Sequence, residues 1–91
     1  MAEPARRVRI TGRVQGVFFR AWTRSQAIEL GVAGWVRNAD DGSVEAHLEG
    51  DEAAVKALID RLQAGPPAAD VEQVEVELAG AEGFDRFEVR H

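Results

Sequence analysis

The chain has 91 residues, a net charge of −5 and no cysteine. This length suits one domain, so we expect residues 1–91 to form a single unit. The missing cysteines exclude disulfides, thiolate zinc sites and cysteine nucleophiles. The acidic balance argues against a general nucleic-acid-binding protein. We expect no signal peptide and no membrane-spanning segment, and hence a cytoplasmic protein that contacts neither nucleic acid nor a membrane.

Positive charge gathers in the first part of the chain. Residues 1–37 hold seven arginines and two acidic residues, whereas residues 38–91 hold four basic and fourteen acidic residues. A local positive field attracts a small anion, while the acidic remainder repels a long polyanion. The alternative is that most of these charges only cover a solvated surface.

The first half of the chain predicts a strand, a helix and a hairpin. Alternating apolar and polar residues indicate a half-buried strand over 7–14, and an apolar stripe at helical spacing indicates a helix over 19–30. Strands over 33–38 and 43–49 follow, joined by the hairpin signal Asp40-Asp41-Gly42. The second hairpin strand is expected to direct apolar residues inward and polar ones outward: Val44, Ala46 and Leu48 against Glu45, His47 and Glu49.

The second half predicts another helix and two strands. Asp51 is placed to cap a helix that ends at Gly65-Pro66-Pro67. Strands are expected over 71–78 and, more briefly, over 84–90. The order β-α-β-β-α-β plus a short C-terminal strand predicts an α+β, ferredoxin-like sandwich. In this fold two helices cover one face of a mainly antiparallel sheet.

The turn before the first helix is the most informative segment. A glycine at position 16 permits an unusual backbone turn, and successive N–H groups at a helix N-terminus attract an anion. Arg20 would add a planar fork for two phosphate oxygens. The helix dipole opposes a cation in a first turn, unless an anion binds there. Residues 15–20 therefore predict a phosphate site; alternatively, Gly16 only shapes a turn and Arg20 is a surface residue.

Asn38 is the second candidate. In this topology we expect the first two strands to be neighbours, which would bring Asn38 close to residues 16–20. Its carboxamide can donate and accept hydrogen bonds, so it can hold a water molecule without titrating. The alternative for Asn38 is a turn residue that caps its own hairpin.

We expect the other residues with reactive or aromatic side chains to have structural roles. Trp35 is expected to pack in the core or on the sheet. The two histidines of the sequence, His47 and His91, are expected to be surface groups rather than ligands or nucleophiles. Asp40 and Asp41 are assigned to the hairpin, because a carboxylate facing a bound phosphate would repel it.

Two segments resemble the paired signature motifs of the acylphosphatases. They read Gly12-x-Val14-Gln15-Gly16-Val17-x-Phe19-Arg20 and Gly34-Trp35-Val36-x-Asn38-x-x-Asp41-Gly42-x-Val44-Glu45-x-x-x-Gly50. The similarity extends over nearly the whole chain, and the residue between Val17 and Phe19 varies in this family. Other positions that fit are Thr23, Gly65-Pro66-Pro67 and the ending from Phe84 to Arg90.

The resemblance implies a hydrolase that cleaves the carboxyl-phosphate bond of acyl phosphates to a carboxylate and inorganic phosphate. It implies that no metal or cofactor is needed. It also implies that Asn38 orients the attacking water and that Arg20 binds the phosphate together with loop amides. These amides belong to Gln15, Gly16, Val17, Phe18, Phe19 and Arg20. We expect a monomer whose partner is a small-molecule acyl phosphate.

The chemistry agrees with the residues themselves. The conjugate acid of a carboxylate leaving group has a pKa of about 4, so the group needs little protonation to leave. Phosphoryl transfer depends chiefly on positioning and on neutralising charge. One alternative is an RNA-recognition domain, which shares the element order but stacks bases on exposed aromatic residues of its sheet. The outward residues of strand 43–49 include no such aromatic ring. Another alternative is a regulatory domain that senses a small anion without turnover.

Overall fold

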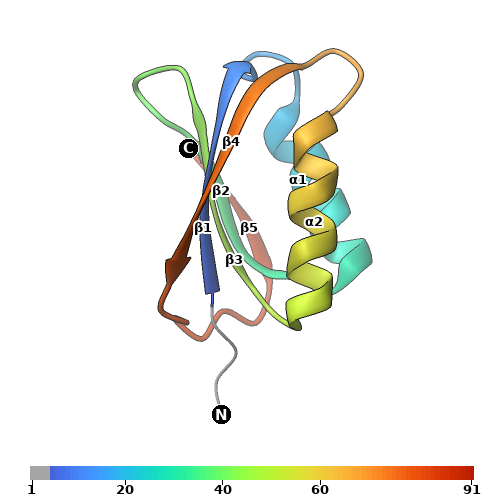
Figure 1. Ribbon diagram of the computed structural model, residues 1–91, viewed down its shortest axis with the longest axis vertical. Helices are drawn as coiled ribbons and strands as arrows, with labels where there is room; N and C mark the ends of the chain where they lie inside the picture. Colours follow the sequence, from blue (N-terminus) through green and yellow to red (C-terminus); the bar gives the residue numbers. More distant parts are fainter. Residues whose placement is uncertain (1–4) are drawn as a thin grey trace.

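The computed structural model describes residues 5–91; residues 1–4, where the sequence predicts no signal peptide, lie outside that range. The predicted α+β sandwich is confirmed, with two helices packed side by side on one face of a sheet (Figure 1). Helix α1 has the predicted bounds, whereas the last strand is shorter than predicted. The elements are β1 (Ala5–Arg13), α1 (Phe19–Leu30), β2 (Ala33–Asn38), β3 (Val44–Glu49), α2 (Glu52–Ala64), β4 (Asp70–Ala79) and β5 (Phe87–Arg90).

The five strands are arranged in the order β4-β1-β3-β2-β5. All neighbouring pairs are antiparallel except β2 and β5, which confirms the mainly antiparallel sheet. The expectation that the first two strands are neighbours is wrong, because β3 lies between β1 and β2. The crossover through α1 skips one strand position, and the hairpin partner β3 fills it by pairing with both strands.

The core lies between the helices and the facing side of the sheet. The predicted inward residues of β3 are fully buried. Both helices bury their core-facing residues, except that Leu30 and Ile59 are only partly buried. This core is formed by Val8, Ile10, Phe19, Ala27, Val36, Val44, Ala46, Leu48, Leu58 and Leu62, among others. Within residues 5–91, no helix is long and apolar enough to cross a membrane.

The start of α2 differs from the prediction. Asp51 occupies the N-cap position, but its side chain makes no capping hydrogen bond. Its backbone carbonyl instead accepts a 2.9 Å bond from the Val55 N–H. Glu52 places a negative charge in the first turn, where the helix dipole favours it.

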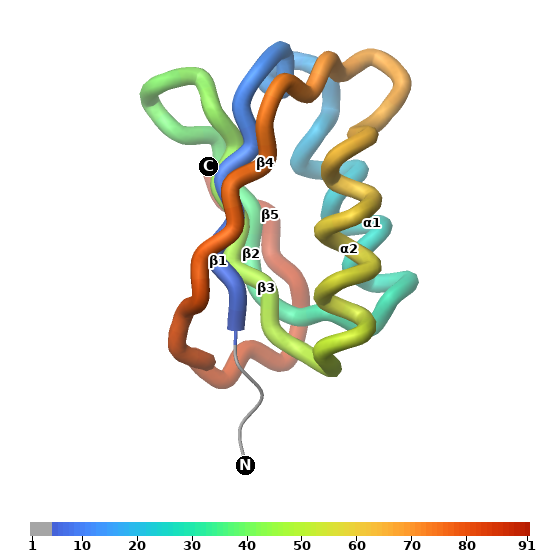
Figure 2. Tube along the Cα trace, in the orientation of Figure 1, coloured from blue at the N-terminus to red at the C-terminus, as the bar shows by residue number. Residues whose placement is uncertain are grey.

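The assignment of His47 to the surface is wrong. Its side chain points away from the helices, as predicted, but it is fully buried. It stacks on Trp35 with ring centroids 6.1 Å apart, and Phe84 covers it at 5.7 Å. The alternation along β3 predicted on which face of the sheet His47 lies. It could not predict that the long segment between β4 and β5 covers His47 on that face. The Figure 2 trace shows this segment crossing the end of the sheet opposite the β2–β3 hairpin.

Glu49 anchors this segment to β3. Its buried carboxylate accepts hydrogen bonds from His47 Nε2 at 2.7 Å and from the backbone N–H groups of Glu82, Gly83 and Phe84 at 2.5, 3.1 and 3.2 Å. Burial raises the pKa of Glu49, but these bonds together outweigh it and hold the pKa below its ordinary value of 4.5. The ionised form of Glu49 therefore stabilises the fold.

We expect Glu49→Gln to lower the free energy of unfolding at pH 7 by about 1–3 kcal/mol, because charge-assisted bonds to buried donors are lost. The folded-state pKa is lowered, so the ionised carboxylate contributes stability above pH 4.5, and this contribution is lost as pH falls through the folded-state pKa. Denaturant unfolding of both proteins from pH 7 to pH 3 should show the difference shrinking below pH 4.5. A difference that stays constant over this range would contradict the assignment.

Candidate functional site

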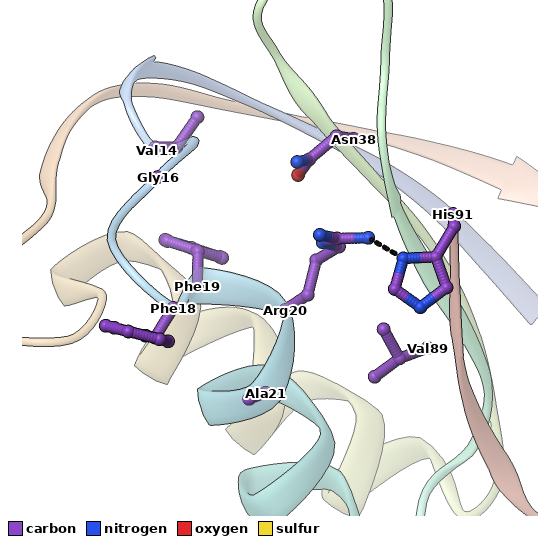
Figure 3. Close-up of a pocket in the computed structure, with 9 residues that line it drawn as sticks. All are labelled: Val14, Gly16, Phe18, Phe19, Arg20, Ala21, Asn38, Val89 and His91. Carbon is purple, nitrogen blue, oxygen red and sulfur yellow. Dashed lines mark hydrogen bonds between the residues drawn. The ribbon is translucent and has the colours of Figure 1, made fainter.

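A pocket of about 420 Å³ opens at the end of the sheet that carries the β1–α1 connection. Three segments form it: this connection with the first turn of α1, the last residue of β2, and the end of β5 (Figure 3). None of its lining residues is acidic. They are Val14, Gly16, Phe18, Phe19, Arg20, Ala21, Asn38, Val89 and His91.

The β1–α1 connection has a left-handed backbone at two positions. Gly16 has φ of 75°, and Phe18 has φ of 60° and ψ of 27° at the N-cap of α1. The left-handed region costs a residue other than glycine about 1–2 kcal/mol. The Phe18 side chain is 86% exposed, so its packing does not offset this cost. Such strain gathers where a backbone must be aimed at something other than its own chain.

The N–H groups of this connection are available to a ligand. Within residues 5–91, none of the backbone N–H groups from Gln15 to Arg20 donates a hydrogen bond. The first such bond of α1 runs from the Trp22 N–H to the Phe18 carbonyl at 3.0 Å. These donors lie at a helix N-terminus, where the dipole adds partial positive charge. The segment thus has the chemistry of an anion cradle.

The Gln15 side chain joins this cradle to the β2–β3 hairpin. Its Nε2 donates to the carbonyls of Ala39 at 2.8 Å and Ser43 at 2.9 Å. This bridge ties the cradle to the hairpin that follows Asn38, although β3 separates β1 from β2 in the sheet. Sequence reasoning considered the backbone N–H of Gln15 and missed its side chain; a glutamine in a loop gives no signal of the carbonyls it will reach.

Arg20 extends from α1 across the pocket toward β5. Its Nη1 donates to the Arg90 carbonyl at 2.9 Å and lies 3.1 Å from His91 Nδ1. Figure 3 shows the guanidinium between the His91 ring and the 14–19 connection, with the Asn38 carboxamide facing the same space. Among residues 5–91, this carboxamide makes no hydrogen bond that would hold it in a hairpin cap. His91 is exposed, as expected, but it lies on the rim of this pocket.

The acidic residues near the site belong to the hairpin, as predicted. Asp41 accepts hydrogen bonds from the Ser43 hydroxyl at 2.6 Å and the Ser43 N–H at 3.0 Å, and it pairs with Arg9. The Ser43 bonds, chiefly that of the hydroxyl, and the nearby Arg9 lower the pKa of Asp41. Its charge is therefore satisfied outside the pocket. Within the described part of the chain, no group of three or more metal-ligating side chains could hold an ion.

Comparison with known proteins agrees with this geometry. A family model described as Acylphosphatase matches residues 6–89. An acylphosphatase of Rhizobium etli is 56% identical over 80 residues, covering 88% of this chain and 85% of that protein. An acylphosphatase of Haloarcula marismortui is 51% identical over 90 residues, covering 99% of each. The crystal structure of acylphosphatase from Bacillus subtilis matches with a TM-score of 0.94 and 36% identity, covering 98% of this chain and 100% of that chain.

Proposed function

Because the chain belongs to the acylphosphatase family, we propose that it hydrolyses acyl phosphates at the pocket formed by the cradle, Arg20 and Asn38. One observation carries the proposal: a connection whose N–H groups make no hydrogen bond within residues 5–91, a guanidinium and a carboxamide line one pocket that no acidic side chain lines. Residues 15–20 bind the phosphate through their backbone N–H groups. Arg20 neutralises the charge on the phosphate oxygens, and Asn38 holds the attacking water.

The reaction needs little more than these groups. The water oxygen attacks phosphorus as the bond between phosphorus and the acyl oxygen breaks. The carboxylate leaves with the bonding electron pair, and the protons of the water stay on the inorganic phosphate that is released. A carboxylate is a weak base, because its conjugate acid has a pKa of about 4, so it departs without a general acid. Charge on the equatorial phosphate oxygens is met by donors that are already in place, which is the main requirement of phosphoryl transfer.

The open face of the sheet argues against the RNA-binding alternative. A base-stacking platform needs exposed aromatic rings, but Trp35 is buried beneath guanidinium groups. Those of Arg7, Arg37 and Arg90 lie 4.9, 5.7 and 4.9 Å from its ring centroid. The ring of His47 is covered as well. The anion-sensing alternative would use the same pocket. A measurement of turnover distinguishes it from hydrolysis.

We expect the purified protein to release inorganic phosphate from benzoyl phosphate, and added phosphate to inhibit competitively because it occupies the same cradle. Phosphate release above the buffer rate is the measurement. If the folded protein binds phosphate but shows no turnover, the hydrolase hypothesis is excluded and the anion-sensing hypothesis remains.

Arg20→Lys should lower kcat/KM by roughly a thousandfold, because lysine keeps the charge but loses the planar pair of donors. Thermal unfolding should change little, since Arg20 is half-buried at the surface of α1. Arg24→Lys, an exposed position one turn further along α1, is the matched control and should behave like the parent. Near-parent turnover in Arg20→Lys would remove the guanidinium from the mechanism.

Asn38→Ala should lower kcat by about a hundredfold, because the water loses its orientation. The inhibition constant for phosphate should stay within about twofold, since the cradle remains. Gln63→Ala removes an exposed carboxamide from α2 and serves as the control. If phosphate binding weakens as much as kcat falls, Asn38 binds the anion rather than the water.

A further inference from the structure

Building on the proposed function, we propose that His91 is a positioning residue. Together with the Arg90 carbonyl, it fixes which edge of the Arg20 guanidinium faces the substrate phosphate. Sequence reasoning gave His91 no role, but its imidazole lies beside the one guanidinium that lines the pocket. The proposal goes beyond Arg20 as a binding group, because it says how that group is oriented.

The orientation of Arg20 depends on which of its donors are already occupied. A guanidinium has five N–H groups in one plane, and two of them belong to Nη1. Two acceptors meet this nitrogen: the Arg90 carbonyl at 2.9 Å and His91 Nδ1 at 3.1 Å. The protein therefore supplies one acceptor for each hydrogen of Nη1.

The remaining donors form the edge that a phosphate needs. The N–H groups of Nε and Nη2 are parallel and can bind two oxygens of one phosphate. Within residues 5–91, neither Nε nor Nη2 of Arg20 makes a hydrogen bond. Figure 3 shows the contact with His91 on the β5 side, while the rest of the guanidinium extends toward the 14–19 connection. The contacts of Nη1 therefore turn the free edge toward the cradle.

This arrangement requires a neutral imidazole, because an unprotonated Nδ1 accepts a hydrogen bond and a protonated one cannot. The tautomer with its hydrogen on Nε2 therefore supplies the acceptor. The Arg90 side chain of β5 is turned away onto Trp35 and Phe84, so the guanidinium that meets His91 Nδ1 is that of Arg20.

Two substitutions separate the acceptor from the shape of the ring. His91→Phe keeps a planar ring but removes Nδ1. His91→Asn removes the ring, but its carboxamide oxygen occupies the same place along the side chain as Nδ1, accepts a hydrogen bond and does not titrate. We expect His91→Phe to lower kcat/KM for benzoyl phosphate roughly tenfold through loss of one charge-assisted bond. His91→Asn should restore most of this loss.

A His91→Phe variant within about twofold of wild type would overturn the positioning role, since loss of the bond is expected to cost more. A His91→Asn variant that loses as much as His91→Phe would overturn it as well, because its carboxamide oxygen supplies the same acceptor.

Binding of inorganic phosphate gives a readout that does not depend on turnover. Calorimetric titration at pH 7.5 should show weaker binding to His91→Phe than to wild type, with His91→Asn close to wild type. If no acyl phosphate is hydrolysed, the proposed function fails, and this titration still decides whether His91 orients Arg20. Equal phosphate affinity in all three proteins would refute the role of His91 whatever the catalytic result.

Discussion

Hydrogen-bond donors that the fold leaves without a partner are the constraint on which this site depends. Backbone N–H groups are nearly always paired inside proteins, yet within residues 5–91 those of Gln15 to Arg20 donate no hydrogen bond. The left-handed backbone at Phe18 is the cost of that geometry. Under the proposed function, the substrate phosphate would satisfy these donors and offset the positive end of α1.

The sheet brings three segments distant in sequence to one pocket. The connection after β1, the end of β2 and the end of β5 all lie at the same end of the fold (Figure 1). The bridge from Gln15 to the hairpin fixes the distance between cradle and Asn38. Acidic residues are numerous in the chain but are held elsewhere, as in the pair of Asp41 with Arg9. Folding therefore produces a positive pocket in a protein whose net charge is negative.

Local patterns predicted most of the fold. The apolar stripe ending at Gly31 gave α1 its bounds, and the alternation around Val44 gave the inner face of β3. Contacts between distant segments could not be predicted in this way. The burial of His47 depends on Phe84 and the loop after β4, and the order of β1, β3 and β2 depends on which strand fills the gap left by the crossover.

The same limit applied to the candidate site. Glycine at position 16 and arginine at position 20 are local signals of an anion-binding turn, and both residues line the pocket. The contact of Arg20 with the end of β5 joins residues about seventy positions apart. No spacing rule covers such a pair, because it arises from the parallel pairing of β5 with β2.

The parallel pairing of β5 with β2 also bears on the thermal stability of the pocket. β5 is a four-residue edge strand, so its opening requires far less free energy than disruption of the sheet centre. Arg20 is tethered to its last residue. Under the proposed function, opening of this edge would release the guanidinium while the hydrophobic core is still folded. Loss of activity on heating would then precede global unfolding.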